Sequence, residues 1–203
     1  MKRVLDVGCG DGHWLLASAA ARPDVEHLGI DILPAPIERA AREAERRGLK
    51  NLRFLAGDAV AWLKKAAIDS LDEIHVYHPQ PYVDPAVVHL GMLTPAFFER
   101  AWRVLRRNGL LVLQTDEKRY GKYLLAAVEK HFAPEVLKGP WPDAPEGRTR
   151  REVVGRRKGM KILRISARRR KVPLTIDVPP PYFDRPGVRR RRVTSRRAKP
   201  ASP

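Results

Sequence analysis

The chain has 203 residues, with 40 lysines and arginines against 23 aspartates and glutamates, for a net charge of +17. It has no apolar stretch of about 18 residues, so no membrane-spanning helix is expected. The single cysteine, Cys9, excludes an internal disulfide framework and fits a reducing cytoplasm, and an early first strand leaves no room for a signal peptide.

Strands alternate with helices along the chain, which predicts βαβ units and a mostly parallel sheet with helices on both faces. Strands are predicted at Val4–Val7, Val25–Ile30, Leu52–Leu55, Glu73–Tyr77 and Leu110–Gln114. Helices are predicted at Gly12–Ala21, Ala35–Arg47, Ala59–Ala67, Pro95–Arg107 and Lys118–His131. Prolines and glycines interrupt residues 134–147, and Gly159–Ala167 is expected to add a late strand at the sheet edge. We therefore predict one α/β domain over residues 1–171.

The positive charge is concentrated in the last quarter of the chain. Residues 1–147 contain 20 basic and 20 acidic side chains, whereas residues 148–203 contain 20 basic and three acidic ones. Three consecutive prolines and the arginine blocks indicate that residues 172–203 form an extended or disordered basic tail. Such a tail suits contact with the phosphates of a polyanion such as RNA, and it equally suits a solvated arm that binds nothing.

A glycine-rich turn follows the first predicted strand. Asp6 is followed by Gly8, Gly10 and Gly12, which expose bare backbone to a cofactor. A dinucleotide-binding turn would need a small residue at the position of His13, so the sequence argues against NAD. The spacing D-x-G-x-G-x-G instead resembles the first motif of class I S-adenosylmethionine (SAM)-dependent methyltransferases.

Acidic residues lie at the carboxyl ends of three consecutive predicted strands, where open α/β sheets bind their ligands. Asp6 follows the first strand, Asp31 the second and Asp58 the third. Asp31 is placed to accept both ribose hydroxyls of a nucleoside, and Asp58 to accept the adenine amino group. Asp58 taken alone equally suits a helix N-cap. Because SAM is cationic, three acids at one edge predict a SAM site.

Later motifs resemble the bacterial tRNA (guanine-N7)-methyltransferase family over residues 3–168. That family has P-D-P-W, a basic run, L-V-Q-P-x-F, T-D-W/x-x-Y and T-x-F-E-x-x-G-x-x-x-G in this order. The matching stretches are Asn51–Ala59, Ser70–Asp72, Pro79–Tyr82, Leu93–Phe97, Thr115–Asp116 with Tyr120, and Thr149–Glu152 with Gly155 and Gly159.

The resemblance implies a class I methyltransferase Rossmann-like fold that methylates N7 of guanine 46 in tRNA, without a metal. It carries SAM binding to Asp6, Gly8, Gly10, Gly12, Asp31, Asp58 and Gln80. It carries catalysis to Gln80 and Asp116. Substrate binding falls to Asp116, Thr149, Arg150, Arg151 and Glu152.

The sequence departs from the family pattern where catalysis is expected. Gln80 replaces the aspartate of P-D-P-W, Tyr82 replaces its tryptophan, and Arg151 replaces the phenylalanine of T-x-F-E. The basic run is absent, with Asp84 where a lysine is expected. Neutral guanine N7 carries a lone pair and no proton, so methylation needs no general base and depends on orientation. A neutral acceptor in place of a charged one is expected to cost about one decade in rate or affinity.

Other basic residues are expected to replace the lost run, because phosphate contacts carry little sequence information. They crowd the last motif: Arg148, Arg150, Arg151, Arg156, Arg157, Lys158, Lys161 and Arg168–Lys171. The loop histidines His78 and His89 lack metal-ligand spacing and are expected to be ordinary polar residues.

Two alternatives remain open at the level of sequence. One is an enzyme on the same scaffold that methylates another RNA or a small molecule, which Gln80 and Asp84 favour. The other is a catalytically silent RNA-binding protein in which the arginine-rich tail is the functional part.

Overall fold

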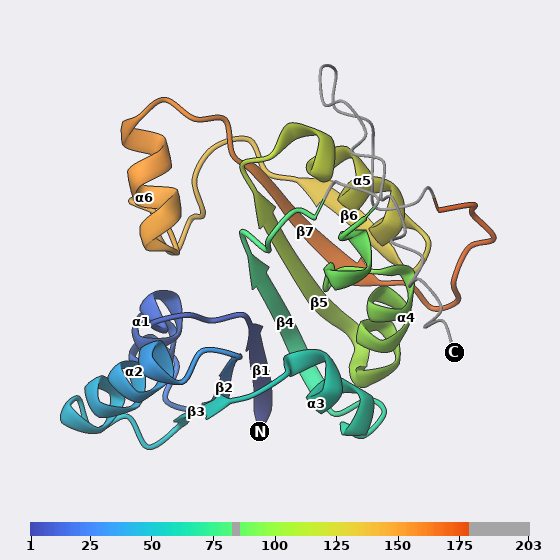
Figure 1. The fold of residues 1–203 in the computed structure, drawn as a ribbon. Helices are drawn as coiled ribbons and strands as arrows, with labels where there is room; N and C mark the ends of the chain where they lie inside the picture. Colours follow the sequence, from blue (N-terminus) through green and yellow to red (C-terminus); the bar gives the residue numbers. More distant parts are fainter. Residues whose placement is uncertain (83–85, 179–203) are drawn as a thin grey trace, which may run out of the picture.

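The computed structural model describes residues 1–82 and 86–178, and these form one sheet flanked by helices (Figure 1). The strand order is β3-β2-β1-β4-β5-β7-β6. The strands are β1 Lys2–Val7, β2 Val25–Asp31, β3 Leu52–Ala56, β4 Leu71–Tyr77, β5 Leu105–Thr115, β6 Phe132–Val136 and β7 Leu163–Arg169. Strands β1 to β5 pair in parallel, and β7 runs antiparallel to both of its neighbours. The predicted α/β class is confirmed.

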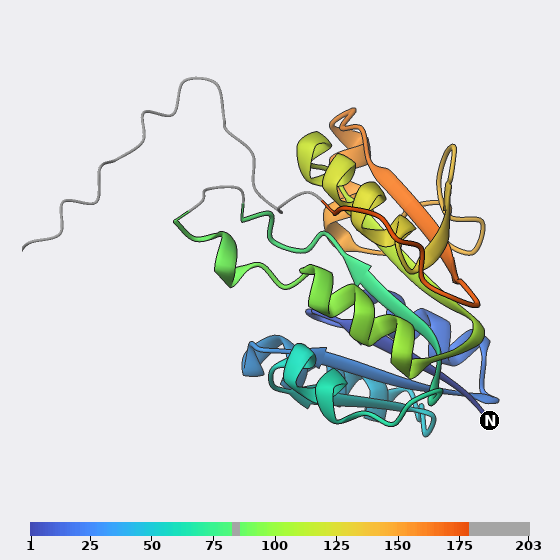
Figure 2. The same ribbon diagram turned by 90° about the vertical axis from the view of Figure 1, so that its right-hand side faces the viewer.

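Helices cover both faces of the sheet, as a parallel sheet requires (Figures 1 and 2). The helices are α1 His13–Ala21, α2 Pro34–Arg46, α3 Ala59–Lys65, α4 Pro95–Val104, α5 Lys118–Glu129 and α6 Arg150–Arg157, with a short 3₁₀ turn η1 at Val88–Leu90. One face packs on α3, α4 and α5. The other packs on α1, α2 and the loop that contains Trp141.

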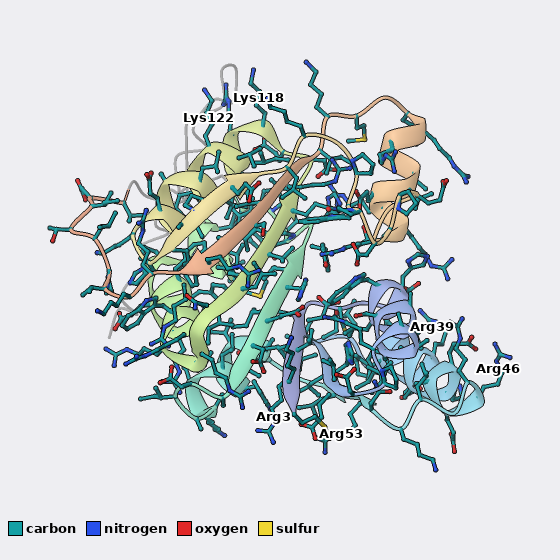
Figure 3. The ribbon with its side chains drawn as sticks, turned by 180° about the vertical axis from the view of Figure 1, so that it is seen from behind. Arg3, Arg39, Arg46, Arg53, Lys118 and Lys122 are labelled. Carbon is teal, nitrogen blue, oxygen red and sulfur yellow. The ribbon has the colours of Figure 1, made fainter. Side chains whose placement is uncertain are left out.

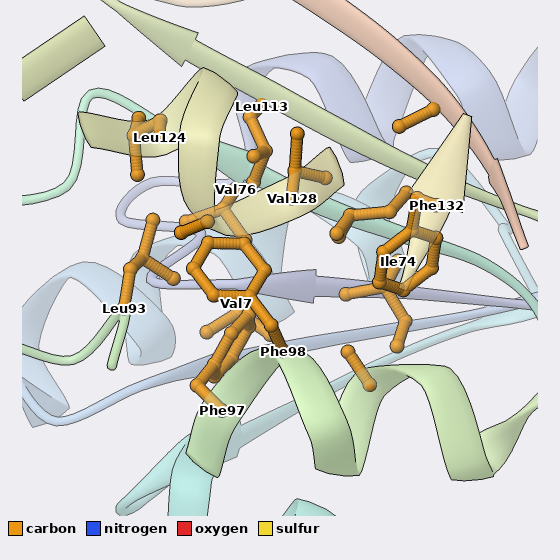
Figure 4. Packing of buried hydrophobic residues seen from close by; sticks show 14 of the residues in the cluster. Val7, Ile74, Val76, Leu93, Phe97, Phe98, Leu113, Leu124, Val128 and Phe132 are labelled. Atoms are coloured by element: carbon orange, nitrogen blue, oxygen red, sulfur yellow. The ribbon is translucent and has the colours of Figure 1, made fainter. Parts of the chain in front are cut away.

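The larger core lies under α4 and α5, where aromatic side chains meet the central strands (Figure 4). Phe97 and Phe98 of α4 are almost fully buried, as are Ile74 of β4 and Leu113 of β5. Full burial of each such side chain contributes roughly 1.5–3 kcal/mol. This apolar layer fixes β1, β4 and β5, whose carboxyl ends carry the site described below.

The last third of the chain differs from the sequence prediction. Residues 132–136 form strand β6 where an irregular segment was expected, and β7 lies between β5 and β6 rather than at the edge. Pro134 is compatible with β6 because β6 is an edge strand, where a missing N–H breaks no ladder. Strand β5 begins at Leu105, five residues earlier than expected, with Asn108 in the left-handed region at φ 61°.

The chain stays attached to the domain beyond residue 171. The Leu174 N–H donates to the carbonyl of Lys130 over 2.7 Å, and Val178 packs against the main core. The arginine blocks predicted to form the tail lie outside the described residues. Within the described part of the chain, no helix is long and apolar enough to cross a membrane.

Candidate active site

The glycine turn lies between β1 and α1 and is shaped by three left-handed residues. Gly8, Gly10 and Gly12 have φ values of 72°, 56° and 67°, a conformation that other residues adopt only with strain. A Cβ at Gly12 would lie 2.5 Å from the Phe54 ring, so a side chain is also excluded there by contact. At Gly8 and Gly10, by contrast, the space within 4 Å is open. The turn therefore presents bare backbone toward open space, as a cofactor requires.

Asp6 lies directly beneath this turn, at the end of β1. Asp6 is buried, with 3% of its surface exposed to solvent, and its Oδ1 has no hydrogen-bond partner among the described residues. Burial raises the pKa of Asp6 to about 8, and repulsion from Asp31 adds to the rise, while Arg148 opposes it. A buried carboxyl group without a partner is costly unless a ligand satisfies it. This position therefore fits a cationic ligand.

Asp31, at the end of β2, is held in place by the same turn. Its two oxygens accept the Gly10 N–H at 2.9 Å and the Leu33 N–H at 3.0 Å. These bonds fix the carboxylate at the carboxyl edge, beside the open space at Gly8 and Gly10. Together, Asp6, Asp31 and the open turn fit SAM, which combines a cationic part with a ribose.

Asp58, at the end of β3, is the N-cap of α3. Its Oδ1 accepts the N–H groups of Val60 and Ala61, at 2.8 and 3.1 Å, and the residue is exposed. The helix-capping interpretation is therefore correct for one oxygen, and adenine recognition by the other stays a prediction. The Gly57 N–H donates to the Asp31 carbonyl over 2.8 Å, which brings the third strand end next to the second.

Gln80 follows β4 on the same edge. The chain leaves the strand through His78, which has a positive φ of 48°, and the buried Pro79, so that Gln80 is exposed. The Tyr82 N–H closes a short turn by donating to the Gln80 carbonyl over 3.1 Å. Asp84, which stands where the resemblance leads us to expect a lysine, lies outside the described residues.

A buried hydrogen-bond relay joins β5 to this loop, and sequence reasoning missed it. Gln114, fully buried near the end of β5, accepts the Trp141 indole N–H through Oε1 at 2.5 Å. Because an indole only donates, the Gln114 amide nitrogen must face His78 Nε2 at 2.8 Å and Glu152 Oε2 at 3.1 Å. His78 Nε2 is then an acceptor, so the imidazole is neutral and carries its proton on Nδ1.

The protonated nitrogen of His78 faces Asp116, just beyond the end of β5. His78 Nδ1 lies 3.4 Å from Asp116 Oδ1. Arg151 contacts the same carboxylate through two bonds of 3.0 Å, from Nε to Oδ2 and from a terminal nitrogen to Oδ1. Although burial opposes ionisation, these partners hold the pKa of Asp116 below its usual value. Burial lowers the pKa of His78, consistent with the neutral tautomer.

Glu152, a predicted substrate contact, is fully buried. Its Oε1 accepts Arg164 Nε at 2.8 Å, and its Oε2 accepts the Arg148 backbone N–H at 2.8 Å and the Gln114 amide. Thr149 caps α6 by accepting the Glu152 N–H at 3.0 Å. In this structure both residues therefore organise α6, and neither carboxylate oxygen of Glu152 lacks a partner.

Residues 137–162, here called the β6–β7 arm, extend from the far end of the sheet to the glycine turn. Arg150 Nε lies 2.5 Å from Asp11 Oδ2, and His13 Nδ1 lies 3.3 Å from the Arg148 carbonyl. The Arg148 guanidinium carbon lies 4.1 Å from the Trp141 ring centroid and 5.2 Å from that of Trp14. The arm thus brings the last motif against the first, as Figure 1 shows for α6 above α1.

Arg148 is also the first member of a series of polar contacts along β4. It donates to the Tyr77 hydroxyl at 3.0 Å, which lies 2.9 Å from His75 Nδ1. His75 Nε2 lies 2.8 Å from Glu73 Oε2, and burial lowers the pKa of His75 to about 4. The ring is therefore neutral, which assigns its proton to Nε2, facing Glu73, and makes Tyr77 the donor to Nδ1.

Cys9 does not have the properties of a nucleophile. Burial and the neighbouring Asp6 and Asp31 raise its thiol pKa above the usual value, so the thiol stays protonated. Its sulfur occupies the space next to Gly29. No group of metal-ligating side chains is found in the part of the chain that the structure describes.

The site residues that the sequence did not reveal are Gln114, Trp141 and Arg164. Arg148 was predicted to contact phosphates, but its side chain is only 12% exposed and instead holds the β6–β7 arm in place. One signal was available for Gln114, since a polar residue near the end of an apolar strand at the binding edge suggests a role there. Trp141 gave no signal, because the partner that explains it comes from a strand 27 residues earlier.

Comparisons with known proteins agree with this arrangement. A family model described as "Putative methyltransferase" matches residues 1–164. A tRNA (guanine-N(7)-)-methyltransferase of Halorhodospira halophila is 32% identical over 165 residues, covering 79% of this chain and 71% of the relative. An enzyme of the same name from Alcanivorax borkumensis is 30% identical over 161 residues, covering 79% and 67%.

Solved structures share the fold at lower identity. The 16S rRNA methyltransferase KamB aligns with a TM-score of 0.60 at 18% identity, covering 83% of this chain and 88% of that one. This likeness concerns the arrangement of the sheet and its helices alone.

Proposed function

The chain belongs to the tRNA (guanine-N(7)-)-methyltransferase family, and from this membership we propose that it transfers a methyl group from SAM to N7 of a guanine in tRNA. The observation that carries the proposal is the buried, unpartnered carboxyl oxygen of Asp6 beneath the open glycine turn. When bound, SAM supplies an electrophilic methyl group on a sulfonium centre.

The residues of the first three strand ends hold the cofactor in this proposal. Asp6 accepts the ammonium group, and its ionisation compensates that charge. Asp31, already oriented by Gly10 and Leu33, accepts the ribose hydroxyls. Asp58 accepts the adenine amino group with Oδ2, since the two helix-capping bonds use Oδ1. Gly8 and Gly10 let the backbone approach the cofactor.

The residues after β4 and β5 orient the guanine. N7 of neutral guanine carries a lone pair and no proton, so no side chain has to remove one. The work of the protein is to hold the base in line with the methyl group and to exclude water. Asp116 supplies a carboxylate for the donor edge of the base, and the exposed amide of Gln80 supplies a neutral acceptor. Glu152 acts indirectly, through Gln114 and Arg164.

Cations flank this edge of the sheet on two sides and would contact the RNA backbone. Arg150, Arg156 and Arg157 are exposed on α6, and Lys118 and Lys122 are exposed at the start of α5 (Figure 3). The arginine blocks after residue 178 would add further contacts with phosphates. Binding of this kind is sequence-independent and weakens with salt. From the proposed tRNA substrate we infer a cytoplasmic enzyme.

The test is methyl transfer from labelled SAM to tRNA prepared from cells that lack N7-methylguanosine. We expect labelled N7-methylguanosine after digestion to nucleosides, and at least about tenfold less with Asp6→Asn at subsaturating SAM. Label in another nucleoside would show a methyltransferase with a different target. Absence of label, with SAM and tRNA both bound, would favour the silent RNA-binding alternative.

A further inference from the structure

The carboxylate of Asp116 is occupied in the free protein by the Arg151 side chain. The Arg151 guanidinium bonds both oxygens of Asp116 at 3.0 Å. The Arg151 side chain is 56% exposed, whereas that of Asp116 is 8% exposed. The acid therefore belongs to the floor of the site, and the arginine reaches it from the surface.

A guanidinium and the Watson–Crick edge of guanine offer a carboxylate the same pattern. Each is planar and presents two adjacent N–H donors side by side, from Nε and a terminal nitrogen in arginine and from N1 and N2 in guanine. Both cannot occupy Asp116 together. We propose that Arg151 is a placeholder for the target guanine, and that the incoming base displaces it from Asp116. This inference rests on the proposed function.

The displacement is feasible because the arginine side chain is largely solvated and the base would replace both of its hydrogen bonds to Asp116. An exposed ion pair changes an equilibrium by up to about fivefold, and the two-bond geometry on a shielded carboxylate raises that figure. Asp116, in contrast, stays in place without Arg151. His78 Nδ1 remains 3.4 Å away, and the relay from Trp141 through Gln114 fixes that imidazole. The next residue, Glu117, is itself anchored as the N-cap of α5.

Once displaced from Asp116, the Arg151 guanidinium is free to bind a phosphate of the RNA. Arg151 is the second residue of α6 and lies next to the exposed Arg150, so a displaced side chain stays at the edge where RNA would pass. Its planar fork matches the oxygens of a phosphate as well as those of a carboxylate. Arg151 thus has two positions, on Asp116 in the free protein and on the phosphate of the bound nucleotide in the complex.

The test uses guanosine and guanosine 5′-monophosphate as probes of the full-length protein, with affinities measured by NMR titration. We expect Arg151→Ala to bind guanosine at least about twofold more tightly than the wild type, because the competitor is gone. The wild type should prefer the monophosphate over guanosine, and Arg151→Ala should lose that preference. Arg39→Ala, which removes an exposed charge from α2, should match the wild type for both probes.

Weaker or unchanged guanosine binding by Arg151→Ala would overturn the proposal, because a simple clamp on Asp116 would behave in that way. Such a binding result would not affect the proposed function as long as the wild type methylates N7 of guanine in tRNA. Failure of the wild type both to bind guanosine and to methylate tRNA would refute the proposed function, and the placeholder with it.

Discussion

At the bottom of the glycine turn, the Asp6 carboxyl group is surrounded by protein and yet has one oxygen without a partner among the described residues. In the unfolded chain an aspartate ionises near pH 4, whereas burial and Asp31 raise the pKa of Asp6 to about 8. Folding therefore takes up a proton between these values, and stability from this group is lost as the pH rises toward 8. The cofactor site is destabilising until its ligand arrives.

We predict that Asp6→Asn removes this pH dependence. In urea unfolding without cofactor, the wild type should lose stability relative to the variant as the pH rises from about 5 to 8, with no further change above 8. The variant should bind SAM at least about tenfold more weakly, because a charge-assisted contact is lost. Parallel pH profiles for the two proteins would contradict the pKa assigned to Asp6.

Gln80 offers a second prediction at this scale. Gln80→Asp restores a charged acceptor on an exposed part of the edge and should raise kcat/KM for tRNA by about tenfold. Gln80→Ala, the matched control, removes the acceptor and should lower kcat/KM by about fivefold. Steady-state measurement of kcat/KM for tRNA at a fixed salt concentration compares the two variants with the wild type. An aspartate variant no better than the wild type would show that Gln80 does not contact the base.

Sequence patterns identified individual site residues unevenly. The glycine turn and Asp31 lie where they were predicted, since their positions follow from strand ends. Glu152 also lies in its predicted motif, but its buried carboxylate is paired with Arg164 of β7. The sequence had placed β7 at the edge of the sheet, whereas it lies between β5 and β6. The predicted contact of Glu152 with substrate could not be judged without the pairing of β7 with β5 and β6.

Among the elements, the first five strands and five helices were predictable because each has its own apolar periodicity. The β6–β7 arm has none. Prolines and glycines interrupt it, and it is ordered by side chains from elsewhere, with Arg148 held by Trp14, Trp141 and Tyr77. Local sequence carries little information on a segment whose structure depends on such distant contacts.

The arm provides a prediction of its own. Arg148→Ala removes two aromatic contacts, the bond to Tyr77 and the ion pair with Asp143, which should cost about 2–4 kcal/mol in the free energy of unfolding. Hydrogen exchange should rise across residues 137–162, and SAM should bind more weakly because the arm contacts the glycine turn. Arg157→Ala is the control. Unchanged exchange in the Arg148 variant would mean that other contacts order the arm.

At the scale of the whole molecule, charge divides the chain into a neutral part and a basic end. Residues 179–203 carry eight lysines and arginines against one aspartate. The contacts of Leu174 and Val178 with the domain place the cleanest truncation after residue 178, seven residues beyond the boundary predicted from composition.

Truncation after Val178 should separate RNA affinity from turnover. We expect kcat at saturating tRNA to be retained, KM to rise, and the dependence of binding on salt concentration to become shallower as phosphate contacts are lost. Binding measured between 50 and 200 mM salt gives the slope. A truncated protein with the same slope would show that the tail does not contact RNA. Loss of turnover at saturation would place the tail in the active site.

The central claim is that this scaffold, with Gln80 in place of an aspartate, methylates guanine at N7 in tRNA. Its most direct test is borohydride and aniline treatment of tRNA after reaction with the wild-type protein and SAM, because this chemistry cleaves the chain at N7-methylguanosine. We predict scission at one guanine, in the variable loop, dependent on SAM and strongly reduced with Asp6→Asn at subsaturating SAM. Incorporated methyl groups without scission would contradict the claim.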